Sequence, residues 1–293
     1  MREKGLVSVV TATYNMAGYI AETLDAVLAQ DYPHIESIIV DDGSTDDTLA
    51  VLKPYLEDPR VRLVSQANAG QTVAKNRGVA EARGEFIAFC DADDTWRPDK
   101  LTRQIPRFED PEVAVVFSDI ICIDGAGAVL DIPAMKRFEG RVTADLLEDN
   151  FVPFPTSVVR AEVLEAVGGF DESLTMSIDN DLWLRISVDH AFAYVREPLA
   201  NYRVWEGQMS NKVGERLDNF FQLLERFLAS YPGVVTDAEI DRAMAHVYVT
   251  RGYWHSREGR KREAIVDYGR AMRHRFLDQR LWRRVGGLLL NRD

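Results

Sequence analysis

Carboxylates gather at two places in this sequence, each directly after a short apolar run. Asp41 and Asp42 follow the run 37–40, and the stretch Asp91-Ala92-Asp93-Asp94 follows the run 86–90. Several carboxylates close together repel one another unless they share a cation. Oxygen ligands favour a hard cation, Mg²⁺ or Mn²⁺, which also takes phosphate oxygens from a substrate. The pattern therefore predicts a divalent-cation site with Asp93 and Asp91 as ligands.

Acidic and hydroxyl residues are also common in turns and at helix starts for purely local reasons. We favour that interpretation for Ser44 and Asp47, which have the spacing of a helix capping box. We favour metal ligation for Asp91 and Asp93, because the run before them has the character of a buried strand. In an open parallel sheet, ligands bind beyond the carboxyl ends of the strands.

Strands and helices alternate along the first part of the chain. Helical spacing of apolar residues predicts helices over 18–30 and 70–82, and Pro98 opens another. Strand–helix units in succession favour parallel strands joined by right-handed crossovers, and hence an α/β fold. The expected strands are the short β-rich runs 6–10, 37–40, 61–64, 86–90 and 113–117.

The character of the chain changes after about residue 125. Short β fragments and helices near 161–167 and 179–189 are expected there, and the chain after Gly214 is expected to be helical to its end. Residues 248–272 resemble one tetratricopeptide helix–turn–helix unit. Such repeats normally need at least three copies to bury a core, so a helical hairpin packed on the body is favoured.

Composition and charge exclude several classes of protein. The chain has 293 residues, 46% of them apolar, and a net charge of −12, which argues against unaided nucleic-acid binding. No stretch approaches the ~20 apolar residues of a membrane-spanning helix, and the first residues lack the apolar core of a signal peptide. The two cysteines, Cys90 and Cys122, cannot form a disulfide framework. We expect a cytoplasmic protein.

The end of the chain has the opposite charge balance. Residues 251–293 carry 12 Lys and Arg against 5 Asp and Glu, whereas the whole chain carries 35 against 47. This segment could contact an anionic membrane surface, which would place the protein at the inner membrane face. The alternative is a solvated helical face rich in arginine.

Other site types lack their signatures. The sequence has no Gly-x-x-x-x-Gly-Lys-Ser/Thr loop, and no Gly-x-Gly-x-x-Gly after the first strand, so a dinucleotide site is disfavoured. The five histidines show no His-Glu-x-x-His spacing. A Gly-x-Ser-x-Gly nucleophile turn is also absent.

Several motifs in order resemble those of family 2 glycosyltransferases, which have the GT-A fold. They are the first strand with Thr13-Tyr14-Asn15, then Val-Asp-Asp-Gly-Ser-Thr-Asp at 40–46, Asn68-Ala69-Gly70, Ala-Lys-Asn-Arg-Gly at 74–78, the strand into Asp91-Ala92-Asp93-Asp94, and 96–101. In the second half, Gly-Gly-Phe-Asp-Glu at 168–172 and Asp-Asn-Asp-Leu-Trp-Leu-Arg at 179–185 continue the resemblance. Three positions depart from the pattern: no proline near Thr11, Lys75 in place of arginine, and Ile178 in place of glutamate.

The resemblance implies a domain layout. Residues 1–210 would form a GT-A domain, with a nucleotide-sugar half at 1–120 and an acceptor half at 121–210. Residues 211–293 would be a basic helical extension. The GT-A fold is a mostly parallel, Rossmann-like sheet flanked by helices.

The resemblance also implies the reaction and the residues that perform it. A sugar would pass from a nucleoside diphosphate, with UDP favoured, to an acceptor hydroxyl with inversion, using Mn²⁺ or Mg²⁺ at Asp93 and Asp91. Asp179 would be the catalytic base, with Asp181 as runner-up, and Asp181, Trp183 and Arg185 would contact or support the acceptor. The expected nucleotide-binding residues are Thr11, Thr13, Tyr14, Asn15, Asp41, Asp42, Asn68, Gly70, Lys75, Asp91 and Ala92.

Three functions fit these features to different degrees. The first is a glycosyltransferase that builds a polysaccharide or a glycolipid, whose acceptor is a carbohydrate, a glycolipid or another hydroxyl compound. The second is a non-catalytic family member that binds a sugar nucleotide or a protein. The third is a sugar-1-phosphate nucleotidyltransferase, which the sequence 11–15 disfavours because it is not glycine-rich.

Overall fold

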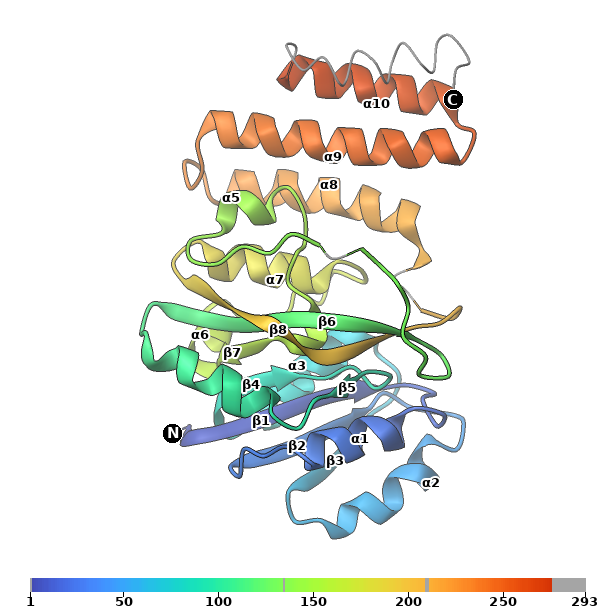
Figure 1. Ribbon diagram of the computed structural model, residues 1–293, viewed down its shortest axis with the longest axis vertical. Helices are drawn as coiled ribbons and strands as arrows, with labels where there is room; N and C mark the ends of the chain where they lie inside the picture. The colour runs from blue at the N-terminus through green and yellow to red at the C-terminus, as the bar shows by residue number, and fades with distance from the viewer. Residues whose placement is uncertain (1, 134, 209–210, 276–293) are drawn as a thin grey trace. The chain divides into compact units, whose positions relative to one another are not determined.

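The computed structural model describes residues 2–133, 135–208 and 211–275. The chain divides into two compact units, one made of residues 1–141 and 151–208, the other of 142–150 and 209–293. The first unit contains one eight-stranded sheet in the order β3-β2-β1-β4-β7-β6-β8-β5 (Figure 1).

The first half of this sheet is parallel, as the sequence predicts. Its strands are β1 (Glu3–Thr13), β2 (Ile35–Asp41), β3 (Val61–Ser65) and β4 (Gly84–Phe89). Every residue of β2 is buried, because helices cover both faces of a parallel sheet.

The helices of this half cover opposite faces of the sheet. Ile20 and Leu24 of α1 (Ile20–Leu28) pack in one cluster with Ile39 of β2. Gly78 of α3 (Gln71–Glu81) lies against Val40, the next residue of that strand. Neighbouring side chains of a strand point to opposite faces, so α1 and α3 lie on different sides. The short helices here are α2 (Thr48–Leu52), the 3₁₀ turn η1 (Lys53–Glu57), α4 (Lys100–Gln104) and η2 (Ile105–Glu109).

The second half of the sheet mixes directions. The short β7 (Val158–Arg160) is antiparallel to both of its neighbours, β4 and β6 (Val113–Asp124). The long β8 (Ala191–Val204) runs parallel to β6, and β5 (Thr95–Trp96) pairs with it at the edge. The remaining elements are η3 (Phe154–Thr156), α6 (Ala161–Ala166) and α7 (Ile178–Ser187).

The expectation of only short β fragments after residue 125 was wrong for β8. This strand has 14 residues, and its pairing with β6 shifts register around Pro198. A proline inside a strand normally argues against a strand and is tolerated at such irregularities. Many side chains of β8 are also only partly buried, so the strand lacks the apolar run that marked the earlier ones.

The second unit is helical. It consists of α5 (Thr143–Leu146), α8 (Val213–Ser230), α9 (Asp237–Arg257) and α10 (Lys261–His274). Figure 1 shows α8, α9 and α10 side by side. A capping box starts α9: Thr236 Oγ1 accepts from the Glu239 amide at 3.3 Å, and the Glu239 carboxylate accepts from the Thr236 amide at 2.8 Å. Residues 142–150, which the sequence placed in the acceptor half, belong to this unit.

Arg251 links the three long helices of the second unit. Its guanidinium bonds Asp267 of α10 at 2.7 and 2.8 Å and Asp218 of α8 at 2.9 Å. Gly252 of α9 lets the Tyr268 ring approach, since a Cβ there would lie 2.9 Å from the ring. No helix among residues 2–133, 135–208 and 211–275 is both long and apolar enough to cross a membrane. The end of the basic segment, residues 276–293, lies outside the described residues.

Candidate functional site

The acidic stretch 91–94 forms the loop that follows β4, and Lys75 of α3 reaches it. The Lys75 Nζ lies 2.9 Å from Asp91 Oδ1 and 4.3 Å from the centre of the Phe154 ring. The side chain of Lys75 is only 6% exposed, whereas that of Asp91 is 33% exposed. A buried cation therefore faces an acidic group that remains open to solvent.

Asp93 is the buried member of the predicted metal pair. Its Oδ2 accepts hydrogen bonds from Trp205 Nε1 at 2.7 Å and from Gln208 Nε2 at 3.3 Å. Burial, together with the nearby charge of Asp91, raises the pKa of Asp93 above its ordinary value, although these two hydrogen bonds oppose the shift. Negative charge is thus concentrated here.

Asp94 is fully buried behind Asp93, and Arg203 of β8 holds it. The Arg203 amide donates to Asp94 Oδ1 at 2.8 Å, and the guanidinium donates to the Asp93 carbonyl at 2.8 Å and to Glu22 at 2.6 Å. Burial and the charges of Asp93 and Asp91 raise the pKa of Asp94 well above its ordinary value. Arg203 therefore fixes the shape of the acidic loop from below.

Sequence reasoning missed Arg203, Trp205 and Gln208. Their partners in the acidic loop lie more than one hundred residues earlier in the chain, and no local spacing indicates such a contact. Only the pairing of β8 with β5 and β6 brings the two segments together.

The residues present fit a cation that takes most of its ligands from a substrate. Among the described residues, no group of three or more His, Cys, Asp or Glu side chains is arranged to hold a metal ion. However, Asp91 raises the pKa of Asp93, and this repulsion is what a divalent cation would relieve. Mg²⁺ is commonly held by one or two carboxylates plus substrate phosphates. Asp93, with Asp91, suits that kind of site.

The two carboxylates after β2 have different surroundings. Asp42 accepts hydrogen bonds from Gln66 Nε2 at 2.8 Å and from the amides of Ala69 and Gly70 at 2.9 and 2.8 Å. Asp42 therefore holds the 66–70 loop in place, and Gly70, with its positive φ of 95°, leads that loop into α3. Asp41 is also buried, and accepts from the Ser44 amide at 3.2 Å.

The end of β1 contributes one exposed and several buried groups. Thr11 and Thr13 are buried, and their hydroxyls have no hydrogen-bond partner among the described residues. Tyr14 is 44% exposed. Asn15 has a left-handed backbone, and its side chain accepts from the Thr45 amide at 2.7 Å, so it links the β1 and β2 loops.

Other predicted residues here have structural surroundings. Asn68 is exposed, whereas Ala92 is buried and its carbonyl accepts from Thr23 at 3.0 Å. The capping role predicted for Ser44 was wrong: its hydroxyl accepts from the Asn15 amide at 2.9 Å, and Asp47 at the start of α2 makes no side-chain cap. The loop contact satisfies Ser44 instead.

Asp179 lies in the first turn of α7 and is partly buried. The residue at the N-cap position is Ser177, in a left-handed conformation with φ of 54°, so the alternative that Asp179 is the N-cap is not what the helix uses. The segment before α7 is tied to the start of α3, because Thr72 Oγ1 donates to the Leu174 carbonyl at 2.8 Å. This contact brings the start of α7 to the helix that carries Lys75.

The other predicted acceptor-side residues are engaged inside the protein. Asp181 pairs with Arg185 at 2.7 Å, and Arg185 also donates to the carbonyls of Val167 and Gly169, each at 2.7 Å. Trp183 is fully buried, with its ring 6.3 Å from that of Phe154. These three residues therefore support α7 and the chain before it.

Comparison with known proteins gives a consistent family signal. The model of the family "Glycosyl transferase family 2" matches residues 8–168. A putative teichuronic acid biosynthesis glycosyltransferase of Bacillus subtilis, TuaG, is 33% identical over 71% of this chain and 82% of its own. An uncharacterized glycosyltransferase of Nostoc sp. is 35% identical over 68% of this chain, which spans 64% of that relative.

Solved structures resemble the fold. S. aureus TarS 1–349 in complex with UDP-GlcNAc has a TM-score of 0.68 at 20% identity, covering 94% of this chain and 82% of its own. A mannosyltransferase from Pyrobaculum calidifontis in complex with GDP-Man and Mn²⁺ also has a TM-score of 0.68 at 20% identity, with coverages of 91% and 75%. The GT-A fold expected from the sequence is confirmed.

Proposed function

Because this chain belongs to glycosyl transferase family 2, we propose that it transfers a sugar from a nucleoside diphosphate to an acceptor hydroxyl, with inversion at the anomeric carbon. The observation that carries this proposal is the cluster at the carboxyl end of β4. There, the buried Lys75 faces Asp91, and the charge of Asp91 acts on the buried Asp93. Ligands of open α/β sheets bind at this end of the strands.

The leaving diphosphate needs positive charge as the glycosidic bond breaks. We infer that Asp93, with Asp91, holds a divalent cation, Mn²⁺ or Mg²⁺, which would neutralise the developing charge on the phosphate oxygens. Lys75 supplies a second positive charge from the other side of Asp91. The solved mannosyltransferase with GDP-Man and Mn²⁺ supports this inference by fold similarity.

The nucleoside would lie over the ends of β1 and β2. Asp41 would accept from the base edge, while Thr11 and Asn15 line the same pocket and Tyr14 offers an exposed ring for stacking. We favour UDP, with GDP and dTDP as alternatives. TarS in complex with UDP-GlcNAc supports the first choice, and GDP-Man in the mannosyltransferase keeps the second in view.

Inversion needs a single in-line displacement, with a base opposite the leaving group to take the proton of the acceptor hydroxyl. We propose Asp179 for this role. Its competitor Asp181 is occupied by Arg185 at 2.7 Å, which favours a supporting role for Asp181. TuaG, named for teichuronic acid biosynthesis, supports a polysaccharide as the product class.

The test is sugar transfer by the full chain from a panel of UDP-, GDP- and dTDP-sugars, with Asp179→Asn as the variant. Asp189→Asn, an exposed carboxylate just beyond α7, is the matched control. Loss of turnover only in Asp179→Asn, with donor binding kept, supports the assignment. A product whose anomeric configuration matches that of the donor, seen by NMR, would rule out inversion, and binding without turnover in the wild type would favour a non-catalytic sugar-nucleotide module.

We also propose that the protein works in the cytoplasm, with its basic C-terminal segment on an anionic membrane. Exposed arginines of the described part, Arg262 and Arg273 among them, suit such a contact. Co-sedimentation with phosphatidylserine vesicles should fall when both are changed to Gln. Equal sedimentation of variant and wild type would argue for a solvated face.

A further inference from the structure

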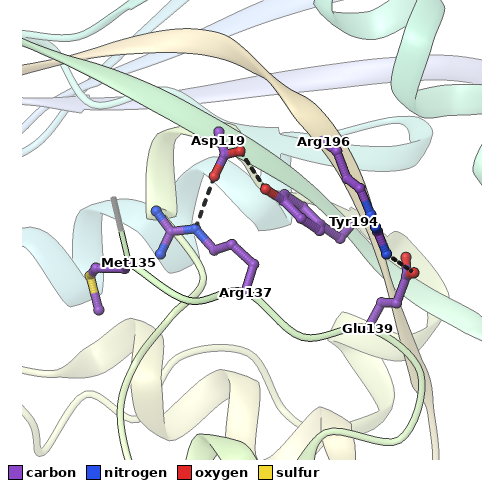
Figure 2. A pocket seen from close by; sticks show the side chains of 6 residues that line it. All are labelled: Asp119, Met135, Arg137, Glu139, Tyr194 and Arg196. Atoms are coloured by element: carbon purple, nitrogen blue, oxygen red, sulfur yellow. Dashed lines mark hydrogen bonds and ion pairs between the residues drawn. The ribbon is translucent and has the colours of Figure 1, made fainter. Parts of the chain in front are cut away.

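A pocket of about 320 Å³ lies on the first unit, away from the residues assigned above (Figure 2). Strands β6 and β8 form one wall through Asp119, Tyr194 and Arg196, and the chain between β6 and α5 forms the other. This second wall consists of Met135, Arg137 and Glu139. The volume is at the lower end of the range for small-ligand sites, about 300–1,000 Å³.

Every charge that lines this pocket has a partner of opposite sign. Arg137 Nε donates to Asp119 Oδ1 at 3.3 Å, and the Tyr194 hydroxyl donates to the other oxygen of Asp119. Burial and Asp119 raise the pKa of Tyr194 to about 12, so its hydroxyl stays protonated. At the rim, Arg196 donates to Glu139 at 3.0 Å. The pocket is neutral overall and offers both donors and acceptors.

The inner and outer pairs differ in how easily they open. The Arg137 side chain is only 7% exposed and also donates to the Phe151 carbonyl at 2.8 Å. The Arg196 side chain is 75% exposed, and exposed ion pairs of this kind contribute little to stability. A ligand could therefore displace the rim pair at small cost, while the inner network stays in place.

Strand register puts this pocket at the same end of the sheet as the acidic loop. Ala88 of β4 and Val116 of β6 both pair with Val158 of β7, so they are level with each other. Asp91 and Asp119 each come three residues later, toward the carboxyl ends of β4 and β6. Two strand spacings of about 4.8 Å separate β4 from β6, so the two positions are about 10 Å apart across the sheet.

A short stretch of chain also connects the two places. Phe151 accepts from Arg137 of the pocket, and Phe154, three residues later, lies under the Lys75 ammonium at 4.3 Å. Three residues span at most about 11 Å. The pocket is therefore within the length of a few sugar residues from the place where transfer is proposed.

We propose that this pocket binds a sugar residue of the acceptor, next to the residue that receives the transferred sugar. The inference rests on the proposed function. A sugar presents hydroxyls that both donate and accept, which matches paired carboxylates and guanidiniums. A phosphate or carboxylate would have to compete with Asp119 and Glu139 for the arginines, so an anionic ligand is disfavoured.

The experiment uses the full chain with methyl glycosides of glucose, galactose and N-acetylglucosamine as probes, and inorganic phosphate as the competing ligand. Saturation-transfer NMR detects binding of each glycoside, and phosphate NMR line width detects binding of the anion. The variants are Tyr194→Phe, which keeps the ring stacked on Phe117 at 5.3 Å, and the exposed Arg196→Gln. Arg103→Gln, an exposed arginine that pairs with Glu197, is the matched control.

We expect at least one glycoside to bind and its affinity to fall about threefold to tenfold in Tyr194→Phe and Arg196→Gln, but not in Arg103→Gln, as for the loss of one hydrogen bond. Binding of phosphate alone, or equal glycoside binding by all variants, would overturn the proposal. Donor hydrolysis without acceptor is measured in parallel. If hydrolysis is absent in the wild type, the proposed function fails; if it is present and equal in all variants while glycoside binding is unchanged, only the pocket assignment fails.

Discussion

Replacement of Lys75 by Met tests whether a buried ion pair organises the acidic loop. Met keeps the length and the apolar contact of the lysine stem with Phe154, but it removes the ammonium 2.9 Å from Asp91. Removing one partner of a deeply buried pair costs about 3–5 kcal/mol. The Asp91 side chain is 33% exposed, so solvent screens it and we expect about 1–2 kcal/mol instead.

This magnitude predicts a measurable change in melting temperature. For a unit of this size, 1 kcal/mol corresponds to about 2–4 °C, so Lys75→Met should melt about 2–8 °C below the wild type. A double-mutant cycle with Asp91→Asn isolates the pair, and its coupling energy should be about 1–2 kcal/mol. Urea unfolding of the four proteins measures that energy. Additivity of the two substitutions within about 0.3 kcal/mol would refute the pairing.

The same variant separates structure from donor binding. Lys75→Arg should keep nucleotide affinity, because a guanidinium can bond a carboxylate and a phosphate together, whereas Lys75→Met should weaken it. Calorimetric titration with UDP and Mn²⁺ measures both. Equal affinity of Lys75→Met and the wild type would leave Lys75 as a structural residue only.

Further variants test the rest of the account. Asp93→Asn should stabilise the nucleotide-free protein at neutral pH, because the raised pKa of Asp93 means that its ionised form destabilises the fold; this penalty is absent below the ordinary pKa and complete above the raised one, so urea midpoints of variant and wild type should converge as the pH falls. Trp205→Phe removes a 2.7 Å bond to Asp93 and should weaken Mn²⁺ affinity about 10–100-fold by fluorescence titration. Gly78→Ala should cost about 1–3 kcal/mol in urea unfolding, since its Cβ would lie 2.4 Å from Val10. Thr236→Ala removes a helix cap and should cost about 0.5–2 kcal/mol by circular dichroism melting.

Local patterns were enough to predict the parallel half of the sheet. The strands before Asp41 and Asp91 are continuous buried runs, which period and burial make visible in the sequence. The acidic loops follow these strands directly, so their place at the sheet's carboxyl end could also be predicted. The position of α7 was predicted for the same local reason.

Long-range contacts could not be predicted in this way. Arg203 and Trp205 meet the acidic loop only because β8 pairs with β5 and β6. The pairing of residues 142–150 with the C-terminal helices likewise depends on tertiary packing. Trp183 and Arg185 carry motif positions of the family, yet the structure engages both inside the protein.

The most direct test of the central claim is thermal unfolding with UDP, GDP, dTDP or CDP, each with and without Mn²⁺. Stabilisation follows the ratio of ligand concentration to Kd, so a real site shows clearly at saturation. One nucleotide should raise the melting temperature only with Mn²⁺, in the wild type and in Asp189→Asn, but not in Asp93→Asn. No rise with any nucleotide, or an equal rise in Asp93→Asn, would contradict a donor site built on the acidic loop after β4.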